Sequence, residues 1–138
     1  MVMLLLLACG LVGPETGDGD SSETAEPLDT GALGHDAVVA PLWQASCVDA
    51  GCHDGTGSVP LDLLNLDPYE QLVSRAALEA PLMDLVEPGH PERSYLVHKL
   101  RGTQLEAGGM GQPMPLESPL ASDELALIEG WIRQGAAR

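Results

Sequence analysis

Two thiols and an imidazole lie close together in the string CVDAGCH, residues 47–53. Four residues separate Cys47 from Cys52, and His53 follows Cys52 directly. Thiolate sulfur and imidazole nitrogen both bind transition metals, and paired thiols also form disulfides or add to a cofactor. The string therefore predicts a chemical site built on one short stretch of chain.

A Cys-His pair preceded by a second Cys is typical of the strings that attach haem covalently, C-x-x-C-H. In that chemistry the two thiols add to the two vinyl groups of haem, and the imidazole becomes an axial ligand of the iron. We expect Cys47 and Cys52 to form the thioether bonds and His53 to bind the iron. The spacer here has four residues instead of two, and Gly51 helps the longer loop to fold back.

Three other uses of these residues stay open. A disulfide between Cys47 and Cys52 suits an exported protein. Zinc could be bound by Cys47, Cys52 and His53, with His90 or His98 as the fourth ligand. Both cysteines could also be buried and inert.

The composition excludes some classes of function. The 138 residues carry six Lys and Arg against 21 Asp and Glu, a net charge of −15. So few basic side chains argue against a nucleic-acid binder and against electrostatic docking to anionic lipid, because both need Lys and Arg. Two Trp, two Tyr and no Phe are few aromatic residues for one domain. The core is therefore expected to be aliphatic, or to be filled in part by something other than the chain.

The N-terminal quarter of the chain reads as an export and tether segment. Eight apolar residues precede Cys9, a run too short to span a bilayer but long enough for the core of a signal peptide. The string LLAC at 6–9 resembles the lipobox of bacterial lipoproteins, in which the Cys becomes the lipidated first residue. We expect residues 1–8 to be a signal peptide, Cys9 to carry lipid, and the acidic residues 9–36 to be a disordered tether in which His35 is solvated.

Residues 37–138 form the expected globular domain. Helix signals, in the form of caps, prolines in first turns and apolar residues at helical spacing, predict four helices at about 36–47, 67–77, 91–100 and 122–132. Gly102 is placed to end the third helix, and Ser122 to cap the last. Gly and Pro make 103–121 a long irregular loop. No run alternates with a period of two residues, so no strand is expected.

Over residues 37–138 the chain resembles a family of bacterial haem-binding domains related to monohaem cytochrome c. The matching strings are CHDG at 52–55, PLDL at 60–63, PYEQLV at 68–73, EPGHPERSYLVHKL at 87–100, GM at 109–110, MP at 114–115 and LASDELALIEGWI at 120–132. The chain departs from the family in its four-residue Cys spacer and at His90, where Asp is more usual. The resemblance implies an all-α, cytochrome c-like bundle of short helices with long loops around one haem c.

The resemblance also implies a second axial ligand, a Met just before Pro in the loop ahead of the last helix. Met114 fits, Met110 is the alternative, and His90 or His98 are the remaining candidates. A thioether ligand raises the reduction potential relative to two imidazoles. A basic cluster of Arg93, Lys99 and Arg101 is available for a haem propionate.

These observations together predict a monomeric single-electron carrier, lipid-anchored in a bacterial cell envelope on the periplasmic side or at the outer membrane. Iron with two protein ligands leaves no position for a substrate, so we expect no enzyme activity. Residues 37–138 carry 14 acidic and six basic side chains, which favours a redox partner with a basic docking face. The alternatives are a haem-free, disulfide-stabilised binding or structural lipoprotein domain, and a five-coordinate haem domain that binds a diatomic gas.

Overall fold

The structure is a computed structural model that describes residues 31–57 and 59–138. The predicted signal peptide, Cys9 and residues 9–30 of the predicted tether lie outside the described residues. Within the described part, no helix combines the length and the apolar character needed to cross a membrane.

Two consecutive helices precede the Cys-rich string. A π-helix, η1 (His35–Val39), runs directly into α1 (Ala40–Ser46). Pro41 lies in the first turn of α1, a position at which proline is tolerated. The helix ends at Cys47, whose backbone N–H donates to the Trp43 carbonyl at 2.9 Å. The string 47–53 therefore begins where a helix stops.

The second helix is shorter than predicted and leads into a hairpin. The Asp67 carboxylate accepts a hydrogen bond from the Tyr69 N–H at 3.0 Å and caps α2 (Pro68–Leu72), as the sequence predicts. The predicted helix to residue 77 is wrong: β1 (Ala76–Ala77) pairs antiparallel with β2 (Ala80–Asp84).

The prediction of an all-α, cytochrome c-like bundle is therefore wrong. The described chain combines short helices with a two-stranded sheet. The hairpin escapes sequence analysis because its strands have two and five residues and β2 does not alternate buried and exposed positions. The hairpin forms by backbone pairing, and its side chains show no period-two pattern from which the sequence could predict it.

The predicted helix at about 91–100 is two helices in the structure, and its end at Gly102 is as predicted. A short 3₁₀-helix, η2 (Pro91–Arg93), precedes α3 (Tyr95–Arg101), which ends at Gly102 in the left-handed conformation with φ of 72°. Residues 103–121 contain no helix or strand, and α4 (Ser122–Arg133) closes the chain. The N-cap of α4 is Ala121, one residue before the predicted Ser122, and its backbone N–H donates to the Glu124 carboxylate at 2.8 Å.

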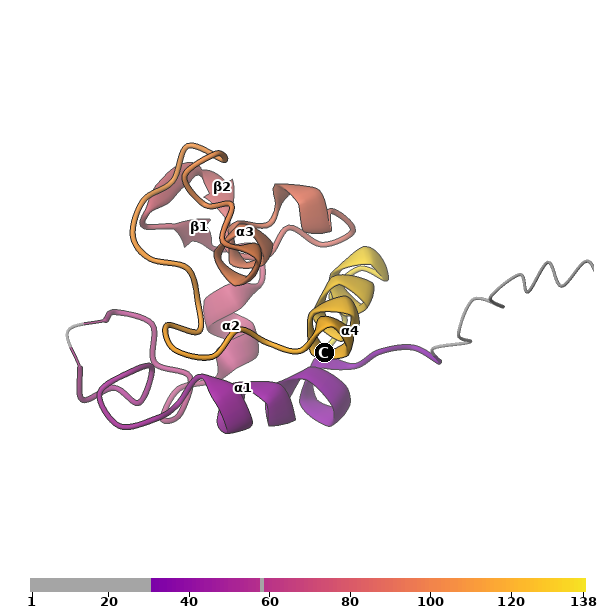
Figure 1. The fold of residues 1–138 in the computed structure, drawn as a ribbon. Coiled ribbons are helices and arrows are strands. Elements are labelled where there is room, and N and C mark those ends of the chain that lie inside the picture. The colour runs from indigo at the N-terminus through magenta and orange to yellow at the C-terminus, as the bar shows by residue number, and fades with distance from the viewer. Residues whose placement is uncertain (1–30, 58) are drawn as a thin grey trace, which may run out of the picture.

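Figure 1 shows how these elements are arranged. Helix α1 lies at one side, the hairpin and α3 lie at the opposite side, and α2 stands between them. The segment 103–121 runs from the α3 side back towards α1 before it enters α4. The predicted apolar face of α4 is confirmed, since Ile128, Trp131 and Ile132 are fully buried in the main core. The other fully buried large side chains of this core are Val39, Trp43, Leu72, Val86 and Val97.

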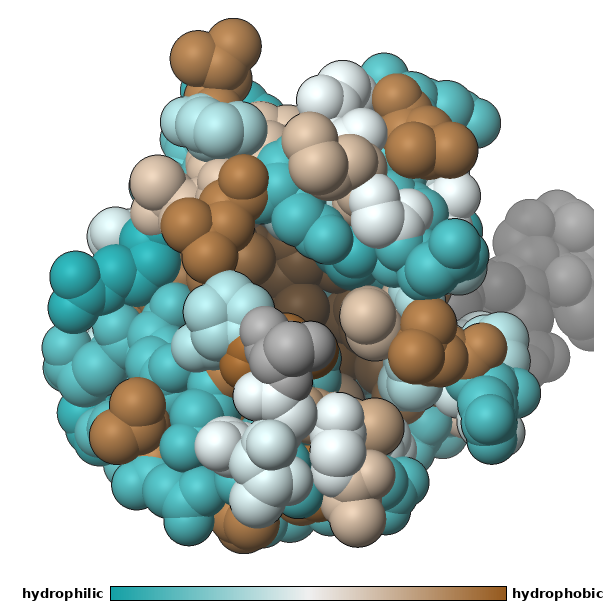
Figure 2. Space-filling view, turned by 90° about the vertical axis from the view of Figure 1, so that its left-hand side faces the viewer, coloured by the Kyte–Doolittle hydropathy of each residue, from teal (hydrophilic) through white to brown (hydrophobic). Residues whose placement is uncertain are grey.

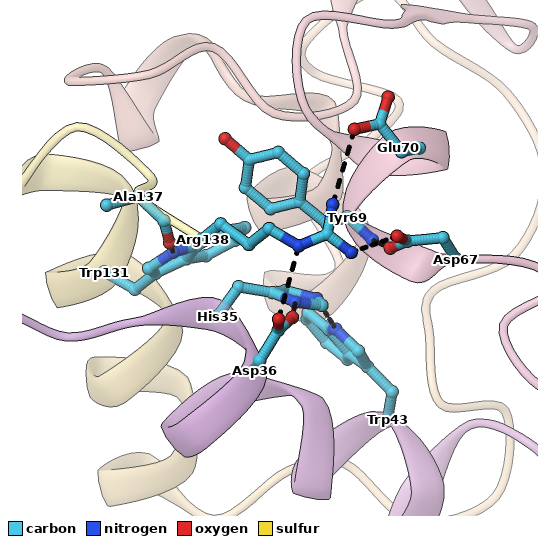
Figure 3. Close-up of polar contacts among 9 residues, drawn as sticks. All are labelled: His35, Asp36, Trp43, Asp67, Tyr69, Glu70, Trp131, Ala137 and Arg138. Atoms are coloured by element: carbon cyan, nitrogen blue, oxygen red, sulfur yellow. Dashed lines mark hydrogen bonds and ion pairs between the residues drawn. The ribbon is translucent and has the colours of Figure 1, made fainter.

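The packed part of the chain begins before residue 37, because His35 is buried. The prediction that this residue is solvated is wrong: only 1% of it is exposed, and its ring lies 5.5 Å from those of Tyr69 and Trp131. Its Nε2 accepts a hydrogen bond from Trp43 Nε1 at 3.0 Å, and its Nδ1 lies 2.7 Å from the Asp36 carboxylate (Figure 3).

The last residues of the chain close over this buried histidine. The Ala137 carbonyl accepts hydrogen bonds from the His35 backbone N–H at 2.9 Å and from Trp131 Nε1 at 2.7 Å. The Arg138 guanidinium forms ion pairs with Asp36, Asp67 and Glu70 (Figure 3). The two ends of the described chain are thereby joined, and three acidic side chains from η1 and α2 share one cation.

Candidate cofactor site

A cavity of about 720 Å³ opens on one face of the molecule. Figure 2 shows this face hollowed at its centre, with apolar residues on the floor and on parts of the rim. The wall is mainly apolar and includes Trp43, Leu61, Leu63, Leu72, Leu96 and Leu100. This volume lies within the range of about 300–1,000 Å³ that is typical of ligand and cofactor sites.

Four of the predicted site residues meet at this cavity. Cys47, Cys52 and His53 line it from the loop after α1, and Met114 lines it from the long segment between α3 and α4. The Met114 N–H donates to the Lys99 carbonyl at 2.9 Å, which attaches this part of the segment to α3. The alternative ligand Met110 does not line the cavity and is 60% exposed. Of the two methionines, the structure brings Met114 to the other three residues.

The His53 ring is held in the form that binds a metal. Its Nδ1 lies 3.0 Å from the Leu61 carbonyl oxygen, which can only accept a hydrogen bond. In the neutral imidazole the proton therefore resides on Nδ1, and Nε2 has the lone pair. The backbone around the ring is fixed as well, because the His53 carbonyl accepts a hydrogen bond from the Leu63 N–H at 2.9 Å.

The four-residue spacer folds into a closed loop. The Cys52 N–H donates to the Asp49 carbonyl at 2.8 Å, and the His53 N–H donates to the Cys47 carbonyl at 3.2 Å. Gly51 has a φ of 83°, a conformation that a residue with a Cβ rarely adopts. These turns allow the two cysteines to reach the same cavity in spite of the longer spacer.

Both cysteines are free thiols in this structure, so the disulfide alternative is not formed. Cys47 is half-buried and Cys52 is exposed. Burial, together with the charge of the neighbouring Cys52, raises the pKa of Cys47 to about 11. In the metal-free chain Cys47 is therefore a protonated thiol at neutral pH.

The two residues proposed as a fourth zinc ligand, His90 and His98, lie elsewhere in the structure. Within the described residues no three His, Cys, Asp or Glu side chains converge in the manner of a metal site. His98 Nδ1 contacts the Thr103 hydroxyl at 2.9 Å and its Nε2 contacts the Glu92 carbonyl at 3.1 Å. His90 is half-exposed and contacts the Glu92 carboxylate. Neither of these histidines lines the cavity.

Charged side chains lie at the cavity wall, but only one of them belongs to the predicted basic cluster. Arg93 pairs with Glu87 and Arg101 pairs with Glu129, so of the three only Lys99 reaches the cavity. Its Nζ lies 2.6 Å from the Glu79 carboxylate, which lines the cavity too.

Arg75, which sequence analysis missed, also lines the wall. The Leu61 carbonyl was missed as well, because the partner of His53 lies eight residues further along the chain and carries no side-chain signal. No known protein family, curated protein or solved structure matches this chain. Its function is therefore inferred from the cavity and the side chains around it.

Proposed function

We propose that this chain is a lipid-anchored protein of a bacterial cell envelope that binds one haem c in the cavity and transfers single electrons. Cys47 and Cys52 are the attachment residues, and His53 and Met114 are the axial ligands. One observation carries the proposal: a loop at 47–53 and a methionine far along the chain meet at one apolar cavity of about 720 Å³.

The donor set and the cavity wall fit such a group. Bound haem supplies an iron that changes between two oxidation states, and its potential depends on the axial ligands and on burial. The Leu61 carbonyl orients the His53 ring and keeps Nε2 available. Trp43, Leu72 and Leu100 keep water away from one side of the site and lower its local polarity.

If His53 and Met114 both bind the iron, no coordination position would remain for a substrate. An electron carrier needs no such position, whereas an oxidase or a gas sensor does. The apolar run before Cys9 supports export and lipid attachment, and the net charge of residues 37–138 supports a redox partner with a basic docking face.

The test is a visible absorption spectrum of the full chain, produced in bacteria that attach haem c. The matched control is the double variant Cys47→Ala with Cys52→Ala. We expect sharp reduced-state bands and haem that stays on the denatured polypeptide, and we expect the control to lose its haem on denaturation. A colourless protein would overturn the proposal, and a spectrum that shifts with carbon monoxide would show an open coordination position instead.

A further inference from the structure

The long spacer between the two cysteines poses a geometrical problem for attachment. A C-x-x-C-H string holds its thiols with two residues between them, and this chain has four. Each added residue brings two more backbone dihedral angles that must be fixed before both thiols meet their targets. A contact that restrains the loop lowers this entropic cost.

Asp54 is the side chain best placed to do so. It is 9% exposed and follows the predicted iron ligand His53 directly. One carboxylate oxygen accepts a hydrogen bond from the Gly51 N–H at 3.0 Å. The other accepts hydrogen bonds from the Thr56 N–H at 3.0 Å and from the Thr56 hydroxyl at 2.8 Å. The carboxylate thus joins residues 51 and 56, and Cys52 and His53 lie between them.

A second set of contacts joins the turn at residues 51–56 to the chain at residues 61–65. Asn65 Nδ2 donates to the Asp54 carbonyl at 2.8 Å. The same stretch of chain provides the Leu61 carbonyl that orients the His53 ring.

We propose that Asp54 is a positioning residue for haem attachment, which holds Cys52 in place so that a four-residue spacer can form both thioether bonds. This inference rests on the proposed function. In the step itself, each thiol adds across one vinyl double bond: a C–S bond forms, and the hydrogen of the thiol ends on the terminal vinyl carbon. No atom leaves, and no external oxidant or reductant is needed.

The hydrogen bonds of the Asp54 carboxylate restrain mainly Cys52. Cys47 is placed by the end of α1, through the hydrogen bond from its N–H to the Trp43 carbonyl. Cys52 has no such helix behind it, and its position depends on the turns on either side. Loss of the Asp54 hydrogen bonds should therefore leave haem bound through Cys47 alone, with Cys52 as a free thiol.

The experiment counts thioether bonds in the full chain by mass spectrometry, after denaturation and alkylation of free thiols. Asp54→Ala is compared with Asp49→Ala, an exposed acidic residue of the same spacer. We expect alkylated Cys52 to rise at least about tenfold in Asp54→Ala, because the loss of a single hydrogen bond to a charged group corresponds to about that factor and this carboxylate accepts three. The reduced spectrum should shift to longer wavelength, because an unreacted vinyl group extends the conjugation of the ring. Asp49→Ala should match the unmodified chain in both readouts.

A second pair of variants covers the case in which Asp54→Ala accumulates no haem protein. A Cβ at Gly51 would meet no atom within 4 Å, so the positive φ is the constraint at that position. Asn adopts this conformation readily and a β-branched residue does not. Gly51→Asn should therefore keep both thioether bonds, and Gly51→Val should show the free Cys52.

The outcomes separate the two proposals. Two thioether bonds in Asp54→Ala, or equal thioether counts in Gly51→Val and Gly51→Asn, would overturn the role of Asp54. If the parent chain, without any substitution, carries no thioether bond, the proposed function itself is overturned, and this inference with it.

Discussion

The hydrogen bond between Trp43 and His35 should contribute measurably to stability. Both side chains are about 1% exposed, and the indole N–H can only donate. His35→Leu leaves that N–H buried without an acceptor, which costs about 1–3 kcal/mol. Trp43→Phe leaves His35 Nε2 without its donor, at a similar cost plus the loss of packing around a smaller ring.

The double variant separates the hydrogen bond from the packing. When both partners become apolar, no buried polar group is left alone, so the cost of the second change is largely removed. We expect the double variant to be more stable than the sum of the two single changes by about 1–3 kcal/mol. For a domain of about 100 residues, each 1 kcal/mol corresponds to about 4–8 °C in Tm.

The assay is urea unfolding of the full chain, followed by far-ultraviolet circular dichroism, for the parent and the three variants. The free energies come from the midpoint and slope of each curve. Single-variant effects that add up to the double-variant effect within about 0.5 kcal/mol would refute the reasoning, because additivity is the behaviour of independent sites. The contact between His35 and Asp36 cancels in this comparison, since it is lost in every variant that lacks His35.

Three further predictions concern the site, the ion pairs and the partner. Met114→Ala should abolish the weak sulfur-to-iron absorption of the oxidised protein and lower the reduction potential by about 59 mV or more, which is a tenfold change in the equilibrium constant for one electron. Met110→Ala, at an exposed position, should change neither the absorption nor the potential. The opposite pattern would assign the ligand to Met110. The Arg138 guanidinium holds the pKa of Asp67 below its ordinary value, so this ion pair stabilises the fold above about pH 4 and is lost as the pH falls through the lowered pKa. The difference in unfolding free energy between the parent and Arg138→Met should therefore shrink from pH 7 to pH 3, and a constant difference would contradict the assignment. Association with a basic redox partner should slow as salt rises, because ions screen the acidic surface, and a salt-independent electron-transfer rate would exclude this steering.

Short-range signals in the sequence were sufficient for several elements. The Asp67 cap, the stop at Gly102 and the buried face of α4 all depend on residues within about one or two turns of one another. Capping and helical periodicity are local properties, so the sequence states them directly. The same holds for the candidate thiols and imidazole, since adjacency along the chain already places Cys52 beside His53.

Other features depend on contacts between distant parts of the chain. The hairpin at 76–84 arises from backbone pairing without a side-chain pattern, and it makes the fold mixed where the sequence indicated helices alone. His35 looks like a polar residue in an acidic tether until Trp43, Tyr69 and Trp131 close around it. The position of Met114 at the cavity, and of Met110 away from it, likewise depends on the path of residues 103–121 past α3. The type of a residue determines which chemistry its side chain can perform. Its burial and its neighbours depend on which segments pack together, and that packing is a property of the whole chain.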